Sequence, residues 1–316
     1  MPNPLRLSLI ALCLVPLAGC GGSGSEGVST TPAVPTPTPT ATTNETLTNL
    51  VASQNFDTAS ATLTATFTDP RDVPSNVTTS QSSGFGNGVA LAYDASSQSY
   101  TISINQGGIS DSVTYSSTHL DNDPDRGFIE YERDASNGDD TTLLLRRTGS
   151  ANSGTNLSYL SYGLWERDID QAGNSDLERW AMFVYGLRTT ASQLPTSGTA
   201  RYSGTLDGLW TTAGASYRLS GTSALTADFA GNSVTGTLTA TGTDRETGAT
   251  VAMDTLSGTA SISRTDASFT GSLAGTSGFS GAFNGGFFGP AATEAGGTFS
   301  VSRGTEQATG VFVAGQ

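Results

Sequence analysis

Hydrophobic and polar residues alternate along most of the chain after residue 55. A period of two places successive side chains on opposite faces of a β-strand, whereas an amphipathic helix repeats every 3.6 residues. In the first half, the alternating segments are separated by Gly, Ser, Asn and Asp, which favour turns. The predicted strands are 61–67, 88–93, 100–104, 128–131 and 156–163. The one ambiguous run, 178–187, contains Trp, Phe, Val and Tyr, which favour a buried strand.

A second pattern begins after the turn-like segment 194–198, which we interpret as a domain boundary. It consists of a hydroxyl residue, glycine, a small residue and usually an apolar residue, with a degenerate copy at 220–221. The six clearer copies are 203–206, 235–238, 257–260, 270–273, 280–283 and 309–312. Each glycine shares a strand face with bulky residues, as Gly204 does with Tyr202 and Leu206, and the opposite face is Ser and Thr.

Large and small residues that alternate on one face fill the inside of a small barrel, and glycine permits sharp bending. We therefore predict a soluble, up-and-down β-barrel of roughly eight strands, with an open sandwich of the same strands as the alternative. A barrel embedded in a membrane would need an uninterrupted apolar outer band with aromatic girdles. The glycine-interrupted apolar face argues against it.

The segment 285–299 (GGFFGPAATEAGGTF) is predicted to be a hairpin of this barrel. One strand covers 279–287, Pro290 ends it, and 291–295 forms a compact connection. We expect Gly296 and Gly297 to adopt positive φ angles before the next strand starts at Thr298. Glu294 is expected to accept hydrogen bonds from backbone donors, with no chemical role.

The N-terminus has the order of a secretory signal peptide over residues 1–19: Arg6, then an apolar run that is too short to span a membrane. The sequence Leu-Ala-Gly-Cys at 17–20 resembles the bacterial lipobox, which makes Cys20 the predicted site of lipid attachment. A cleavage site with an incidental cysteine is the alternative. Residue 21 is Gly, so the aspartate of the inner-membrane retention signal is missing, which implies the outer membrane.

Composition divides the rest of the chain into a linker and two folded parts. Residues 20–46 are rich in Gly, Ser, Pro and Thr and are predicted to be a disordered, lipidated stalk. We assign 55–190 to an antiparallel sheet domain and 195–316 to the barrel, so the predicted fold class is all-β. Without the signal peptide, 13 basic residues face 28 acidic ones, a net charge of −15, which disfavours nucleic acid and anionic membranes as partners.

Candidates for chemistry are few. His119 is the only histidine, and Cys13, the only cysteine besides Cys20, lies in the signal peptide. A Ser-His-Asp or Cys-His site would therefore have to use this one imidazole, and we predict no enzyme activity and no cofactor. Asp121, Asp123, Asp125 and Glu132 have a spacing that is partly typical of a calcium loop, although Pro124 and a displaced glycine favour an acidic surface turn. The spacing of Tyr159, Tyr162 and Trp165 favours core packing over a ligand surface.

Several of these motifs together resemble a known family. They are 286–290 (GFFGP), Glu294, 296–299 (GGTF), 309–312 (TGVF), 195–204 (PTSGTARYSG) and the pair Asp228-Phe229. They resemble the C-terminal barrel of the transferrin-binding protein B family of surface lipoproteins over residues 195–316. Residues 55–190 match only in strand content and in 162–165 (YGLW), where the family has a sheet-based handle domain.

The resemblance implies a lipoprotein of the outer membrane, displayed at the cell surface, that binds an extracellular protein or metal-bearing ligand. It also implies a TonB-dependent receptor as partner. The classical protein has two such lobes and this chain has one, so no ligand-binding residue is carried over. A structural or adhesive lipoprotein and an envelope enzyme remain as alternatives.

Overall fold

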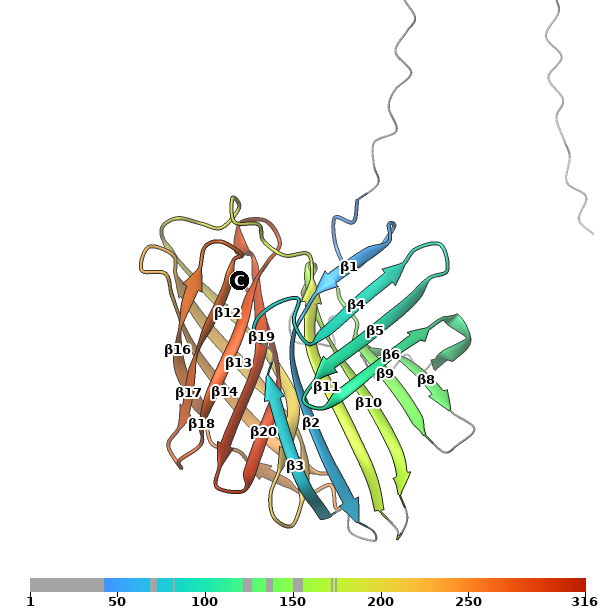
Figure 1. Ribbon diagram of the computed structural model, residues 1–316. Helices are drawn as coiled ribbons and strands as arrows, with labels where there is room; N and C mark the ends of the chain where they lie inside the picture. Colours follow the sequence, from blue (N-terminus) through green and yellow to red (C-terminus); the bar gives the residue numbers. More distant parts are fainter. Residues whose placement is uncertain are drawn as a thin grey trace, which may run out of the picture. The chain divides into compact units, whose positions relative to one another are not determined.

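The computed structural model shows an all-β protein, as predicted (Figure 1). It describes residues 43–68, 73–81, 83–121, 127–134, 139–149, 156–171, 173 and 175–316. The signal peptide, Cys20 and most of the predicted linker lie outside the described residues. The described residues belong to one compact unit, Thr42–Gln316, and the division of this unit near Pro195 remains a prediction. In this part of the chain, no helix has the length and apolar character needed to cross a membrane.

Two antiparallel sheets precede the barrel. The four-stranded sheet has the order β1-β4-β5-β6 and the seven-stranded sheet the order β3-β2-β11-β10-β9-β8-β7. Their strands are β1 (Gln54–Asp57), β2 (Ala59–Thr68), β3 (Val73–Gln81), β4 (Val89–Asp94), β5 (Ser99–Gln106), β6 (Ile109–Tyr115), β7 (Leu120–Asp121), β8 (Phe128–Asp134), β9 (Asp140–Arg146), β10 (Leu160–Gln171) and β11 (Ser175–Gly186). The ambiguous run 178–187 is strand, in β11. The strand predicted at 156–163 begins later, at Leu160.

The second half forms the predicted eight-stranded barrel. Each of the eight barrel strands pairs with the next one along the chain, including β13 with β14, and the antiparallel pair β12–β20 closes the ring. This confirms the up-and-down topology. The strands are β12 (Thr199–Thr211), β13 (Ser216–Asp228), β14 (Ser233–Asp244), β16 (Leu256–Ser263), β17 (Ser268–Gly275), β18 (Ser280–Phe288), β19 (Glu294–Arg303) and β20 (Glu306–Gly315). A short extra strand, β15 (Thr250–Ala252), pairs with the end of β14.

The glycine pattern is explained mainly by close approach between strands. A Cβ atom on Gly204 would overlap the carbonyl oxygen of Val313 on β20, and one on Gly271 would overlap that of Thr259 on β16. Gly236 differs, because its missing side chain leaves room for the rings and methyl groups of Phe283 and Leu225 inside the barrel. Gly236 therefore makes room for side chains, as the pattern of large and small residues predicted, but close contact with neighbouring backbone, which was not predicted, is the commoner reason for glycine.

Large side chains fill the barrel interior. The bulky partners of the glycine pattern point inward, and six phenylalanines of the barrel core are almost fully buried: Phe269, Phe279, Phe283, Phe287, Phe299 and Phe312. Ring centroids in this group lie 5.5 Å apart for Phe269 and Phe287 and 6.1 Å apart for Phe283 and Phe312. These are ordinary distances for aromatic packing, so the interior is a solid core.

Strand β11 of the seven-stranded sheet is buried on both faces along most of its length. On β11, Trp180, Met182 and Val184 face the barrel, while the alternate residues Phe183 and Tyr185 face the four-stranded sheet. A strand that is covered on both sides needs no polar face. This double burial is the reason why the run 178–187 lacks the alternation seen in its neighbours.

The hairpin at 285–299 is only partly as predicted. η4 (Pro290–Ala292) follows β18, but Gly296 and Gly297 lie inside β19 and do not have positive φ angles. That prediction was wrong: the positive φ angles belong to Gly289, at 73°, Ala291, at 54°, and Ala292, at 58°. Gly297 is required for a different reason, because a Cβ there would overlap the carbonyl oxygen of Asn284 on β18.

Candidate functional site: the cleft between the sheet and the barrel

A shared apolar core joins the seven-stranded sheet to the barrel. Strands β2, β10 and β11 contact β19 and β20 of the barrel. The core between them contains Leu63, Phe67, Tyr162, Trp180 and Met182 from the sheet and Leu209, Phe288, Val311 and Val313 from the barrel. The barrel residues of this core lie on the outer face of their strands, where most other positions are Ser or Thr. The sheet therefore covers the apolar strip of the barrel wall.

Glu294 is one of the polar links across this interface. Its carboxylate accepts hydrogen bonds from the backbone N–H groups of Ser158, at 2.7 Å, Tyr159, at 3.0 Å, and Leu160, at 2.8 Å. These donors lie just before and at the start of β10. Burial raises the pKa of Glu294, and the three N–H groups oppose that rise. The predicted role of Glu294 as an acceptor for backbone donors is confirmed, but its donors come from the sheet and not from its own hairpin.

A second polar link joins Glu178 on β11 to Arg245 in the turn after β14. The guanidinium Nη2 lies 3.0 Å from the carboxylate, and both side chains are nearly buried. The rings of Phe67 and Trp180 lie 5.0 and 5.2 Å from the Arg245 guanidinium carbon. Burial, reinforced by the negative charges of Glu166 and Asp168, outweighs Arg245 and raises the pKa of Glu178 to about 7.

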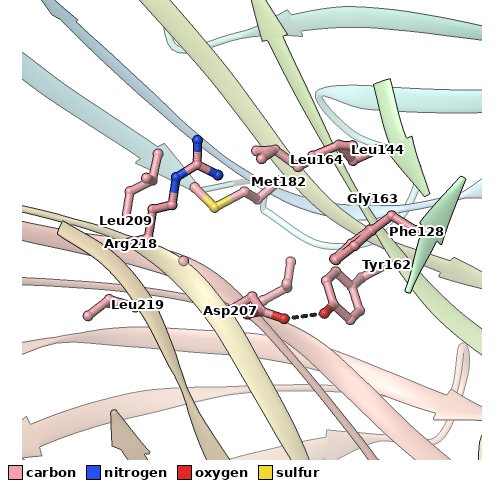
Figure 2. Close-up of a pocket in the computed structure, with 12 residues that line it drawn as sticks. Phe128, Leu144, Tyr162, Gly163, Leu164, Met182, Asp207, Leu209, Arg218 and Leu219 are labelled. Atoms are coloured by element: carbon pink, nitrogen blue, oxygen red, sulfur yellow. Dashed lines mark hydrogen bonds between the residues drawn. The ribbon is translucent and has the colours of Figure 1, made fainter. Parts of the chain in front are cut away.

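Farther along the sheet from this ion pair, toward β9 and β8, the sheet and the barrel enclose unfilled space. A cavity of about 150 Å³ is lined mostly by apolar residues of both layers (Figure 2). They include Phe128, Leu144, Leu164 and Met182 from the sheet, and Leu209, Leu219 and Val311 from the barrel. We call this space the inner cavity.

A second space, the outer cavity, adjoins it and has a volume of about 370 Å³. The two cavities share Phe128, Leu144 and Arg218, and together we call them the cleft. The outer cavity is more polar, because Glu130, Thr142 and Glu166 also line it. The sheet side of its wall is therefore acidic, and the barrel side carries the cation of Arg218.

Tyr162 and Asp207 form a hydrogen bond across the floor of the inner cavity (Figure 2). The phenol O–H of Tyr162, on β10, donates to the carboxylate of Asp207, on β12. Burial raises the pKa of Asp207, an effect that the Tyr162 hydrogen bond opposes, and burial also raises the pKa of Tyr162. The pair fastens the sheet to the barrel, and its polar atoms are directed at each other.

The lining of the cleft is suited to binding. Neither cavity has His or Cys in its lining. Its apolar walls offer burial for a small hydrophobic group, and its charged rim offers orientation. Among the described residues, no group of three or more His, Cys, Asp or Glu side chains has the geometry of a metal site.

The structure separates the other candidate residues. Tyr162 and Trp165 are buried, as core packing predicted, while Tyr159 is half-buried, and only Tyr162 reaches the cleft. His119 lies away from the cleft, in η1 (Ser117–His119), where its Nδ1 accepts a hydrogen bond from the backbone N–H of Ser116. Asp121 and Glu132 lie on β7 and β8, whereas Asp123 and Asp125 lie outside the described residues, so the calcium loop remains a prediction.

Sequence reasoning missed Asp207, Leu209 and Arg218. A usable signal existed for Leu209, which is a bulky apolar residue at an outward position of a strand whose outer face is otherwise mainly polar. Val311 and Val313 carry the same signal on β20. Such residues mark the part of a barrel wall that another layer covers. Nothing in the sequence indicated that Arg218 would face the same space as Glu166.

The protein is thus an all-β lobe in which a closed barrel is joined to an antiparallel sheet. Residues 194–316 match the family model described as the C-lobe and N-lobe β-barrels of transferrin-binding protein B. The match covers 123 of the 316 residues and confirms, for the barrel, the resemblance seen in the sequence.

Similarity to individual proteins is more limited. A segment is 33% identical over 66 residues to transferrin-binding protein B of Haemophilus influenzae, which is 21% of this chain and 11% of that protein. The chain thus matches about a tenth of the length of this relative.

Among solved structures, transferrin-binding protein B of Haemophilus parasuis has a TM-score of 0.42 and 15% identity, with 84% of this chain and 76% of that chain covered. For the protein of Neisseria meningitidis, the TM-score is 0.39 and the identity 19%, with coverage of 73% and 52%. The family assignment rests on the barrel match alone.

Proposed function

We propose that the protein is a non-catalytic binding module, anchored by lipid at Cys20 to the outer membrane and displayed at the cell surface, that captures an extracellular protein ligand. The observation that carries the proposal is the barrel of residues 194–316, which belongs to a family named after transferrin binding. More specifically, the protein captures an iron-carrier protein and delivers it to a TonB-dependent receptor.

The shape of the lobe supports a binding role. Phenylalanine rings pack inside the barrel, and the two cavities of the cleft lie outside it, which favours binding at outer surfaces or in the space between the layers. The polar links formed by Glu294, Arg245 and Tyr162 hold the sheet against the barrel. A rigid platform of this kind loses little conformational entropy when a partner binds.

Direct binding measurements test the ligand class. We expect the purified full chain to bind transferrin or lactoferrin when either is immobilised, and not to bind serum albumin, an acidic control protein. A deletion strain should then grow poorly when the bound carrier is the only iron source. A strain that uses this iron normally but attaches poorly to surfaces would reject iron capture in favour of an adhesive function.

The anchor is tested separately. Cells that express the chain should incorporate labelled fatty acid into it, and the Cys20→Ala variant should lose the label. External protease should degrade the protein on intact cells if it is displayed at the surface. Incorporation of label into the Cys20→Ala variant would reject this site of attachment.

A further inference from the structure

The inner cavity has the size and lining of a site for one apolar side chain. Its volume is about 150 Å³, and an apolar cavity of about that size accepts a benzene molecule. Leu144 and Met182 of the sheet and Leu209 and Val311 of the barrel supply its walls. A ring or a branched aliphatic group that enters this space exchanges water contacts for close packing.

The outer cavity places opposite charges on its two walls. Arg218 stands on the barrel side and is exposed, and no described residue forms an ion pair with its guanidinium. Glu166 lines the sheet side. A guanidinium at the entrance of an apolar cavity is well suited to a carboxylate, which it binds through two parallel hydrogen bonds.

The ion pair between Arg245 and Glu178 lies next to the outer cavity and can be compared with Arg218 and Glu166. Arg245 follows Thr243, the partner of Arg218 in the barrel ladder, by two residues. Glu166 pairs with Trp180, which follows Glu178 by two residues in the sheet ladder. Arg245 and Glu178 meet at 3.0 Å, whereas the outer cavity separates Arg218 from Glu166. Two arginines of the barrel thus stand opposite two glutamates of the sheet. Arg245 and Glu178 form an ion pair, whereas Arg218 and Glu166 line a cavity.

We propose that the cleft binds a small zwitterion with one apolar side chain, of the class of the free apolar α-amino acids. The carboxylate of the ligand pairs with Arg218, its ammonium group pairs with Glu166, and its side chain enters the inner cavity between Leu144 and Leu209. This inference does not depend on the capture of a protein ligand.

Titration calorimetry of the full chain with L-phenylalanine and its fragments provides the test. We expect L-phenylalanine to bind at least tenfold more tightly than phenylacetate, which lacks the ammonium group, and than phenethylamine, which lacks the carboxylate. Glycine, which lacks the side chain, should show no binding at millimolar concentration. Equal affinities for the three aromatic probes, or no binding by any of them, would overturn the proposal.

Three variants and one control localise the site. Arg218→Ala should weaken L-phenylalanine at least tenfold and leave phenethylamine unchanged, and Glu166→Gln should weaken phenethylamine and leave phenylacetate unchanged. Leu144→Trp should fill the inner cavity and abolish binding of all three probes. Arg201→Ala removes an exposed arginine near the other end of the same barrel wall and should change nothing. Unchanged affinity in Arg218→Ala, with the fold intact by circular dichroism, would contradict the proposal.

Discussion

The barrel interior and the cleft are built from similar apolar side chains, yet one is a core and the other is partly empty. Phe312 on β20 is 0% exposed inside the barrel, whereas Phe128 and Leu164 at the cleft are half-buried. The interior is surrounded by eight strands whose spacing is set by ladder hydrogen bonds, so large and small residues can fill it completely. The cleft is bounded by two separate surfaces that meet along β2, β3, β10 and β11.

The difference shows that closure, and not residue type, decides whether apolar residues form a core or a binding surface. Apolar side chains are closely packed where hydrogen-bonded strands surround them on all sides, as in the barrel. The sheet and the barrel share only part of their facing surfaces. Polar links hold them together there, and the cleft remains beside the contact. Arg245, Glu294 and Tyr162 supply such links.

The largest effect is expected from breaking the closed region. Phe312→Ala should lower the free energy of unfolding by about 3 to 5 kcal/mol, because it leaves a ring-sized cavity in a core that cannot collapse. Leu164→Ala, at the half-buried edge of the cleft, is the matched control and should cost no more than about 1.5 kcal/mol. Urea unfolding of both variants measures the difference, and equal losses would show that the two regions are equally well packed.

The pH dependence of stability tests the interface through Glu178. Its pKa is raised from 4.5 to about 7 in the folded protein, so between these values the native state binds more protons than the unfolded state. Stability must therefore fall as pH rises through this window, by up to about 3 kcal/mol for this one group. The difference in unfolding free energy between wild type and Glu178→Gln, measured at pH 5 and pH 8, should change by most of that amount. A constant difference would contradict the raised pKa.

A smaller loss is expected from the link at Glu294. Glu294→Gln replaces an acceptor-only group by an amide. Even with its oxygen placed to accept from Tyr159 and Leu160, its N–H₂ opposes the backbone donor of Ser158, which should cost about 1 to 3 kcal/mol. Glu306→Gln, which weakens the partly exposed pair with Arg303, is the control and should cost less than about 1 kcal/mol. Thermal unfolding of the two variants would decide, and a smaller loss at Glu294 than at Glu306 would reject its role as a link.

The smallest effect on stability is expected at Arg218. Because its side chain is exposed and has no ion-pair partner among the described residues, Arg218→Ala should change the free energy of unfolding by less than about 0.5 kcal/mol. Denaturant titration measures it. A loss above about 1 kcal/mol would mean that Arg218 holds the two layers together, as Arg245 does, and is not available for a ligand.

Much of the fold could be predicted from local patterns. Period-two alternation identified β2, β4, β5 and β8, and the recurring glycine beside bulky residues indicated a closed barrel, since both patterns arise from neighbours on one strand or on the next. The prediction failed at Gly296 and Gly297, because glycine serves both positive φ angles and close backbone approach and the sequence does not distinguish them. The start of β10 was also missed, because Ser158 and Tyr159 give their N–H groups to Glu294.

The sequence by itself determined the all-β class, the barrel and the match of its last 123 residues to a barrel family, because these depend on side-chain periodicity and on short motifs. Only the tertiary structure decided which barrel face is covered, that Glu294 reaches the sheet, and that Arg218 and Glu166 face one unfilled space. Those facts depend on the angle at which two layers meet, and that angle is set by side chains far apart in the chain. Ser158 and Glu294, for example, are separated by 136 positions, so no local pattern in the sequence indicates their contact.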